Sequence, residues 1–290
     1  MKDYIIRGID KKGNIRLFVA TSTHMVEEAR KTHGTSPTAT AALGRVLTAA
    51  VLLGITMKGE RDALTFKIKG DGPIGSIIAV SNNGGQVKGY VDNPYADLPS
   101  RPDGKLDVGG LVGKNGQLAI IKDLGLKEPY IGYSNLVSGE IAEDLVHYFH
   151  LSEQQPSAIN LGVLVDKDIS VRAAGGYILQ LLPGVEDKDI DRIEGILKKA
   201  KPISTLIHQG LSPEQVMETL FGEFEMEILE RKEIEYKCNC NRKRIEGVLL
   251  SLGKEEINKI IEEDEKAEII CHFCNKKYHF SKEDLQKLMD

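Results

Sequence analysis

Four cysteines carry the clearest chemistry in this sequence, and all of them lie near its end. They form two short clusters, Cys238-Asn-Cys240 and Cys271-His-Phe-Cys274, within the last 53 residues. Four thiolates from two such clusters can satisfy the tetrahedral coordination of a zinc ion and leave no position open. The sequence therefore predicts one zinc site per chain, with Cys238, Cys240, Cys271 and Cys274 as its ligands.

Such a site has two interpretations. Under the first, the zinc ion is purely structural: a small segment with few buried apolar residues needs an added cross-link, and zinc provides it. Thiolates are also oxidisable, however, and their oxidation destroys the metal ligands. Within each cluster the two cysteines are close enough in sequence to pair locally, which would leave the clusters unconnected once the metal is lost. Under the second interpretation the site is a redox switch that loosens its module on oxidation.

Two variations on the cysteine chemistry have less support. A thioredoxin-like CxxC enzyme needs its first cysteine at a helix N-terminus, which lowers the thiol pKa. Here the β-like run Ala267-Glu268-Ile269-Ile270 leads into Cys271 instead. His272 or His279 could replace a cysteine as ligand, but four sulfurs already suffice. A thiol-disulfide oxidoreductase therefore stays an alternative, and we expect no enzyme.

A zinc-ribbon RNA-binding protein is an alternative from a different class. The basic residues Lys237, Arg242, Lys243 and Arg244 flank the first cluster and could contact phosphate. The net charge of −5 opposes this, because it provides no global basic field for nucleic acid or for an anionic membrane. We expect neither as a partner.

The segment Gly70-Asp71-Gly72-Pro73-Ile74-Gly75 matches the glycine pattern of a dinucleotide-binding turn. That turn must lead into a helix that crosses the sheet. Here the short run Ser76–Val80 follows, and it ends at Asn82-Asn83-Gly84-Gly85, a strong hairpin signal. The glycines therefore predict a tight turn, and no nucleotide cofactor is expected. The sequence has no phosphate-binding loop and no HExxH or GxSxG motif.

Charge density divides the chain. From residue 223 to 290, 30 of 68 residues are charged, against 51 of the 222 before them. We expect an N-terminal domain over residues 1–222, a connector over 223–237 and a zinc-binding module over 238–290. Overall the chain is 41% hydrophobic and 28% charged, which is typical of a soluble globular protein.

The N-terminal domain reads as α+β, with antiparallel sheets built from short strands. Expected strands span 4–9, 15–20, 64–69, 76–80, 86–91, 118–122, 129–136, 159–165 and 170–182. Expected helices span 23–33, 37–57, 187–199, 203–209 and 213–220, with another capped by Ser138 and running to about His150. In the module we expect helices over 242–250 and 254–262 and a small hairpin around Cys271 and Cys274.

Two segments indicate whether the protein is secreted and whether it spans a membrane. The first ten residues, MKDYIIRGID, lack the apolar core of a secretory signal. The stretch from Thr38 to Met57 is apolar enough to suggest a membrane span, but Arg45 lies in its middle, so we expect a buried helix. Cysteines confined to one site also favour a cytoplasmic protein.

Taken together, these motifs resemble the redox-regulated bacterial heat-shock chaperones of the 33 kDa chaperonin family. The resemblance covers nearly the whole length. It depends on His33-Gly34-Thr35 with the following SPTATAALGRVL, on Gly70–Gly75, on KDLGL from Lys122, on SEQQPS from Ser152, on AAGGY from Ala173 with LPG from Leu182, and above all on CxC followed by CHFC.

The resemblance implies a holdase that works without ATP. In this family the reduced protein holds zinc on four cysteines and is inactive. Oxidation forms two disulfides, releases zinc and favours a homodimer that binds unfolding proteins. Carried over, the resemblance and the short loops predict the pairs Cys238–Cys240 and Cys271–Cys274. No motif shared with the family identifies which residues of this sequence bind client proteins. We further hypothesise that the connector docks on the N-terminal domain and leaves it on oxidation.

Overall fold

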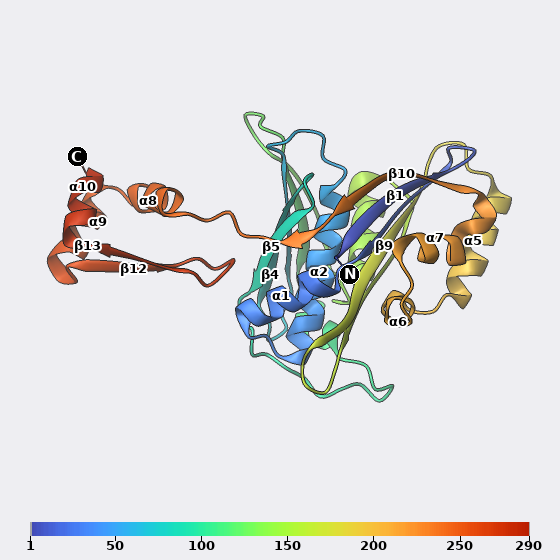
Figure 1. The fold of residues 1–290 in the computed structure, drawn as a ribbon, viewed down its shortest axis with the longest axis horizontal. Helices are drawn as coiled ribbons and strands as arrows, with labels where there is room; N and C mark the ends of the chain where they lie inside the picture. Colours follow the sequence, from blue (N-terminus) through green and yellow to red (C-terminus); the bar gives the residue numbers. More distant parts are fainter. Residues whose placement is uncertain (1, 290) are drawn as a thin grey trace. The chain divides into compact units, whose positions relative to one another are not determined.

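The computed structural model describes residues 2–289, and the chain divides into two compact units, residues 1–236 and 237–290. Figure 1 shows their helices and strands along the chain. The first unit combines helices with two largely antiparallel sheets, and the second combines three helices with one hairpin. The α+β prediction is confirmed.

Two sheets form the frame of the first unit. The five-stranded sheet has the order β10 (Met226–Glu233), β1 (Tyr4–Asp10), β2 (Ile15–Thr21), β9 (Val171–Leu181) and β8 (Ser157–Val165). The six-stranded sheet has the order β11 (Glu235–Tyr236), β5 (Gln86–Val91), β4 (Ser76–Asn82), β3 (Ala63–Lys69), β6 (Gln117–Asp123) and β7 (Tyr130–Asn135). All pairs are antiparallel except β11 with β5.

Helices α1 (Thr23–His33) and α2 (Pro37–Gly54) follow the opening hairpin; α1 has the predicted bounds, and α2 begins where predicted but ends three residues before Met57. Gly34 ends α1 in the left-handed conformation, with φ of 61°, which suits glycine. The Ser36 side chain accepts a hydrogen bond from the backbone N–H of Ala39 and so caps α2, while Pro37 occupies its first position. Figure 1 shows α2 between strands of the two sheets, and it contacts both.

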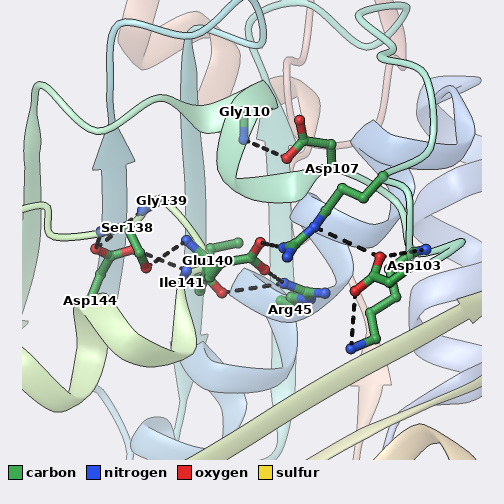
Figure 2. Close-up of polar contacts among 11 residues, drawn as sticks. Arg45, Asp103, Asp107, Gly110, Ser138, Gly139, Glu140, Ile141 and Asp144 are labelled. Atoms are coloured by element: carbon green, nitrogen blue, oxygen red, sulfur yellow. Dashed lines mark hydrogen bonds and ion pairs between the residues drawn. The ribbon is translucent and has the colours of Figure 1, made fainter.

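The burial of α2 distinguishes a membrane span from a core helix. The helix is long and apolar enough to cross a membrane, but 89% of it is buried inside the protein. Its one charged residue, Arg45, donates to Glu140 at 2.6 Å (Figure 2), and the other carboxylate oxygen of Glu140 lies 3.1 Å from Arg101. The prediction of a buried helix is confirmed, and the ion pair explains how a charge is accommodated there.

The glycine-rich segment 70–75 is a turn between paired strands. It joins β3 to β4, which run antiparallel with Lys69 opposite Ser76, so no helix follows it. A Cβ on Gly70 would lie 2.1 Å from the carbonyl oxygen of Val112, so the backbone approach there needs glycine. Val112 ends α3 (Val108–Val112), a short helix that the sequence analysis missed. The prediction of a tight turn is confirmed.

One helix begins later than predicted. Instead of starting at Ser138, α4 spans Ala142–Tyr148 and continues as the π-helical turn η1 (Phe149–Glu153). The carboxylate of Asp144 accepts hydrogen bonds from the backbone N–H groups of Ser138, Gly139 and Ile141, ahead of the helix (Figure 2), and from that of Val137. Asp144 holds these residues in a loop, so Ser138 is not the cap.

A second apolar core lies on the other face of the five-stranded sheet. It is covered by α5 (Asp187–Lys199), α6 (Ile203–His208) and α7 (Pro213–Phe221). Ser212 and Gln215 form a reciprocal capping box at the start of α7, with Pro213 at the first helical position. These three helices agree with the predicted spans within one residue.

The connector, residues 223–237, contributes strands to both sheets. After the short 3₁₀ turn η2 (Gly222–Phe224), β10 pairs antiparallel with β1 along its whole length. β11 then adds to β5. Phe224 and Ile234 are buried, at 9% and 6% exposed, whereas Ile228 on β10 is 46% exposed. By its pairing the connector belongs to the first unit as far as Tyr236, and the second unit starts one residue before Cys238.

The second unit is small but has a core of its own. Its elements are α8 (Arg242–Leu250), α9 (Lys254–Glu263), β12 (Lys266–Ile270), β13 (Lys277–Ser281) and α10 (Lys282–Met289). The hairpin β12–β13 and the two predicted helices are present; α10 was not predicted. The buried core residues are Ile245, Leu249, Ile257, Ile261, Tyr278, Phe280 and Leu285.

Candidate metal centre

The structure brings the four predicted cysteines together. Their sulfur atoms all lie within 4.8 Å of one another. The Sγ atoms of Cys238 and Cys271 are 3.7 Å apart, and those of Cys240 and Cys274 are 3.3 Å apart. All four residues are partly buried and belong to the second unit. Each close pair joins one cluster to the other across more than thirty residues of chain.

Two local structures present the sulfurs. Cys238 and Cys240 lie in the extended segment that enters α8, where the Asn241 side chain caps the helix. Cys271 and Cys274 lie in the turn between β12 and β13. In that turn the carbonyl of Cys271 accepts hydrogen bonds from the N–H groups of Cys274 at 3.2 Å and of Asn275 at 2.8 Å.

Asn275 completes the turn with a φ of 56°, and asparagine tolerates this left-handed conformation. The N–H of Cys271 then bonds the carbonyl of Lys276 at 3.0 Å and closes the loop onto the strands. The turn points both thiols of the CxxC cluster toward one centre.

The donor set fits one soft, tetrahedrally coordinated metal ion. Zinc–sulfur bonds of about 2.3 Å around a tetrahedral ion place neighbouring sulfurs about 3.8 Å apart. The observed separations of 3.7 and 3.3 Å lie close to that value. Four thiolates would also close the coordination shell, which is typical of structural rather than catalytic zinc. The cluster can therefore hold one metal ion.

Tyr278 is the nearest neighbour of the cluster that the sequence analysis missed. Its hydroxyl donates to the Cys240 sulfur at 3.1 Å. Burial raises the pKa of the Cys240 thiol, but the hydroxyl and the other three cysteines outweigh it and lower that pKa to about 7. Burial instead keeps the thiol pKa of Cys238 and Cys274 above the usual value. Tyr278 lies seven positions after Cys271 in the sequence. It was predicted as part of the hairpin, and nothing in the sequence indicated that its hydroxyl donates to a sulfur.

The residues behind the alternative interpretations lie elsewhere. No histidine belongs to the metal-ligand group found among residues 2–289. His279 instead lies 3.3 Å from a carboxylate oxygen of Glu268 at the surface. Within the basic cluster around the first cysteines, Arg242 pairs with Asp284 at 2.8 Å and stacks on the Phe280 ring at 4.5 Å. That arginine therefore supports the fold of the module.

A second polar contact missed by the sequence analysis lies in the first unit. The hydroxyl of Tyr236, in the connector, donates to the carbonyl of Gly89 at 2.9 Å. The Nε2 atom of His33, at the end of α1, is also 2.9 Å from this hydroxyl. These contacts hold Tyr236, the last residue of the first unit, against the end of α1 and against β5.

Comparison with known proteins gives one consistent answer. The family description "Hsp33 protein" matches residues 3–281. Curated relatives called 33 kDa chaperonin include those of Acetivibrio thermocellus, 52% identical, and Bacillus cereus, 47% identical. The chain is matched over its full length in both cases, covering 97% and 99% of those proteins.

A solved structure agrees with the sequence comparison. The crystal structure of the 33 kDa chaperonin of Thermotoga maritima superimposes with a TM-score of 0.90 at 40% identity. The match covers 100% of this chain and 98% of that one. With the fold, the cysteine cluster and the relatives in agreement, this chain belongs to the Hsp33 family of chaperones.

Proposed function

We propose that the chain is a redox-regulated holdase that works without ATP and binds unfolding or oxidatively damaged proteins. In the reduced state Cys238, Cys240, Cys271 and Cys274 hold one zinc ion and the protein is inactive. The observation that carries the proposal is the four-sulfur cluster, with separations that suit a single tetrahedral ion. Such a cluster is both a staple and an oxidisable group.

Oxidation would remove the ligands in pairs. Each pair of thiolates, with peroxide and two protons, gives one disulfide and two molecules of water. Two peroxides therefore convert all four cysteines to disulfides, and zinc leaves because no thiolate remains. We propose the pairs Cys238–Cys240 and Cys271–Cys274, from the short loops and the family resemblance. Neither pair connects the two clusters, so the module loses its staple.

The connector links this event to client binding. While the module is folded, the connector has a fixed end and stays on the first unit. There, β10 pairs with β1, Arg231 stacks over the Tyr4 ring at 4.0 Å, and Ile234 is 6% exposed in the main core. Release would uncover Tyr4, the edge of β1 and the site of Ile234. Apolar surface and an open strand edge are what unfolding chains bind.

Further partners follow from the same mechanism. We propose that clients are partly folded proteins, that oxidation favours a homodimer, and that the protein acts in the cytoplasm without nucleic acid or membrane. The homodimer is expected because uncovered apolar surface is shared between copies when no client is present.

The decisive experiment measures three quantities on one sample before and after peroxide: bound zinc, free thiols, and suppression of aggregation of a denatured client. We expect one zinc and four thiols before, and no zinc, no thiols and full suppression after. Suppression that is equal before and after peroxide would contradict redox control while leaving the chaperone activity intact.

Peptide mapping of the oxidised protein tests the connectivity. The structure places the cross-cluster sulfurs of Cys238 and Cys271 at 3.7 Å and those of Cys240 and Cys274 at 3.3 Å, close enough for cross-pairs to be a competing outcome. Finding mainly those cross-pairs would mean that oxidation keeps the clusters joined. The unfolding mechanism would then be wrong.

Two assays separate the alternatives. A zinc-ribbon RNA-binding protein would bind RNA in the reduced form, with an affinity that falls steeply with salt. A thiol-disulfide oxidoreductase would turn over a disulfide substrate many times per chain. We expect neither activity.

A further inference from the structure

A partly open cavity of about 160 Å³ lies between the two sheets of the first unit, beside the end of α2. Much of its wall is apolar. Phe18 on β2, Ile178 on β9, Ile120 on β6 and Leu52 on α2 line it, and each is at most 2% exposed. The cavity lies in the first unit and involves none of the cysteines.

Arg16 is one of three charged residues that line this cavity, with Lys122 and Glu153. It lies on β2 opposite Gln180 of β9, and its Nε and Nη2 atoms donate to the Gln180 side-chain oxygen at 3.1 and 2.7 Å. Those are the hydrogen bonds that its side chain makes with the described residues, and no ion pair within residues 2–289 includes it. A half-buried guanidinium charge is thus held by a neutral amide.

A neighbouring arginine, Arg7, adds a second positive charge beside Arg16, and its own terminal nitrogen pairs with Glu230 at 3.6 Å. The β1–β2 register places Arg7 opposite Phe18, on the same face as Arg16. The Nε atom of Arg7 is buried and has no hydrogen-bond partner among residues 2–289. Burial, and then the charge of Arg7, lower the pKa of Arg16, so the guanidinium is held in a site that disfavours its charge.

The remaining charges in the cavity neutralise each other. Lys122 Nζ lies 2.7 Å from Glu153 Oε1, and the Tyr148 hydroxyl donates to the same oxygen at 2.9 Å. Among the charged residues that line the cavity, Arg16 is therefore the one without an opposite charge. A buried charge is stabilised strongly by a paired anion that also accepts its hydrogen bonds.

We propose that this cavity binds a small monocarboxylate with an apolar body. The carboxylate pairs with the Arg16 guanidinium, which Gln180 holds in place, and the body packs against Phe18, Leu52 and Ile178. An apolar cavity of about 150 Å³ accommodates benzene. A single aromatic ring or a short branched chain therefore matches the size of this one.

The chemistry sets a clear preference. A neutral ligand of the same shape gains the apolar contacts but leaves the guanidinium unpaired, whereas a carboxylate gains both. For ligands of about ten non-hydrogen atoms, a dissociation constant on the order of 0.1–1 mM is expected. Binding should not depend on the redox state of the cysteines, because the cavity lies in the first unit.

Calorimetric titration and thermal unfolding of the reduced, zinc-loaded, full-length protein test the proposal. Benzoate and 3-methylbutanoate are the probes, with benzamide as the neutral match for benzoate at constant ionic strength. We expect both carboxylates to bind and to raise the unfolding temperature, and benzamide to bind about tenfold more weakly or not at all.

Variants assign the site. R16Q should weaken benzoate binding about tenfold or more, and R16K should retain part of it. R172Q is the matched control: Arg172 is also on the five-stranded sheet but pairs with Asp166 at the surface, outside the cavity. It should bind benzoate like the unaltered protein.

Three results would overturn the proposal: no carboxylate binding up to about 20 mM, equal binding of benzoate and benzamide, or unchanged binding by R16Q. Far-ultraviolet circular dichroism checks that R16Q folds. If R16Q does not fold, the comparison of benzoate with benzamide on the unaltered protein still decides the outcome.

Discussion

Replacing one sulfur of the cysteine cluster separates a metal site from a chance grouping of thiols. Cys271 takes part in both the cluster and the turn, where its carbonyl accepts two hydrogen bonds. C271S leaves three thiolates and a poor fourth ligand, so tight zinc binding should be lost. Competition with a chromophoric chelator under reducing conditions measures this. Unchanged zinc affinity in C271S would remove Cys271 from the site.

Tyr278 tests the surroundings of the cluster at the same scale. Its hydroxyl donates to the Cys240 sulfur, as groups around a metal site often do to its ligands. Y278F should still bind one zinc but about tenfold more weakly, the lower end of the usual effect of such partners. The same chelator competition measures it. An affinity equal to that of the unaltered protein would show that the hydroxyl does not tune the site.

An acidic residue of α1 gives a pH prediction. The Arg30 guanidinium, at 2.8 Å, lowers the pKa of Glu27 to about 2, with the N–H of Val171 also bonded to this carboxylate. Since the folded-state pKa is below the unfolded value of 4.5, the stabilisation is present above pH 4.5 and is lost as the pH falls toward 2.

E27Q should therefore lower the free energy of unfolding of the first unit by about 1 kcal/mol at pH 7, a value reduced for solvent screening. The difference between E27Q and the unaltered protein should shrink as the pH falls from 4.5. Denaturant unfolding at several pH values measures it. A difference that stays constant down to pH 3 would show that the carboxylate charge is not what stabilises α1 against β9.

At the scale of elements, the connector should be held on the first unit by its buried residues, Phe224 and Ile234. Strand β10 is mostly exposed, and Ile234 is the aliphatic side chain that it leads into the main core. I234S should release the end of the connector while leaving all four cysteines unaltered. We expect suppression of client aggregation without oxidant, with zinc still bound.

I228S is the matched control, because Ile228 lies in the same connector but is 46% exposed. It should remain inactive until oxidised. If I234S is also inactive without oxidant although its connector exchanges amide hydrogens faster, then undocking is not what activates the protein.

At the scale of the whole molecule, the two units should differ in their dependence on metal. The second unit has a core of seven buried residues and 54 residues in all, whereas the first has two larger cores. Zinc binding of order 10 kcal/mol exceeds the stability expected of so small a unit. Chelation under reducing conditions should therefore unfold residues 237–290 and leave residues 1–236 folded.

Hydrogen exchange with mass spectrometry measures this unit by unit. Protection in β12, β13 and α9 should disappear on chelation, and protection in α2 should remain. Retained protection in the hairpin without zinc would show that the apolar core of the second unit is sufficient, and that metal loss alone cannot drive the switch.

Short sequence patterns predicted many of the helices, turns and ligand clusters of this protein without any knowledge of its tertiary contacts. Caps such as Ser36 with Pro37 and Gly34 act within one turn of chain, so the bounds of α1 and the start of α2 were predictable. The spacing of the cysteines within each cluster likewise predicted a metal site, because each pair lies within three or four residues of chain, in an extended segment for Cys238 and Cys240 and in a turn for Cys271 and Cys274. Asn82–Gly85 predicted a hairpin for the same reason.

Only the tertiary structure decided the rest, because it depends on groups far apart in sequence. Tyr278 reaches Cys240 across 38 residues, and Tyr236 reaches Gly89 across 147. The unpaired charge of Arg16 exists because two sheets close over it. No sequence pattern within a single segment predicts these contacts, because they form only when folding brings distant segments together.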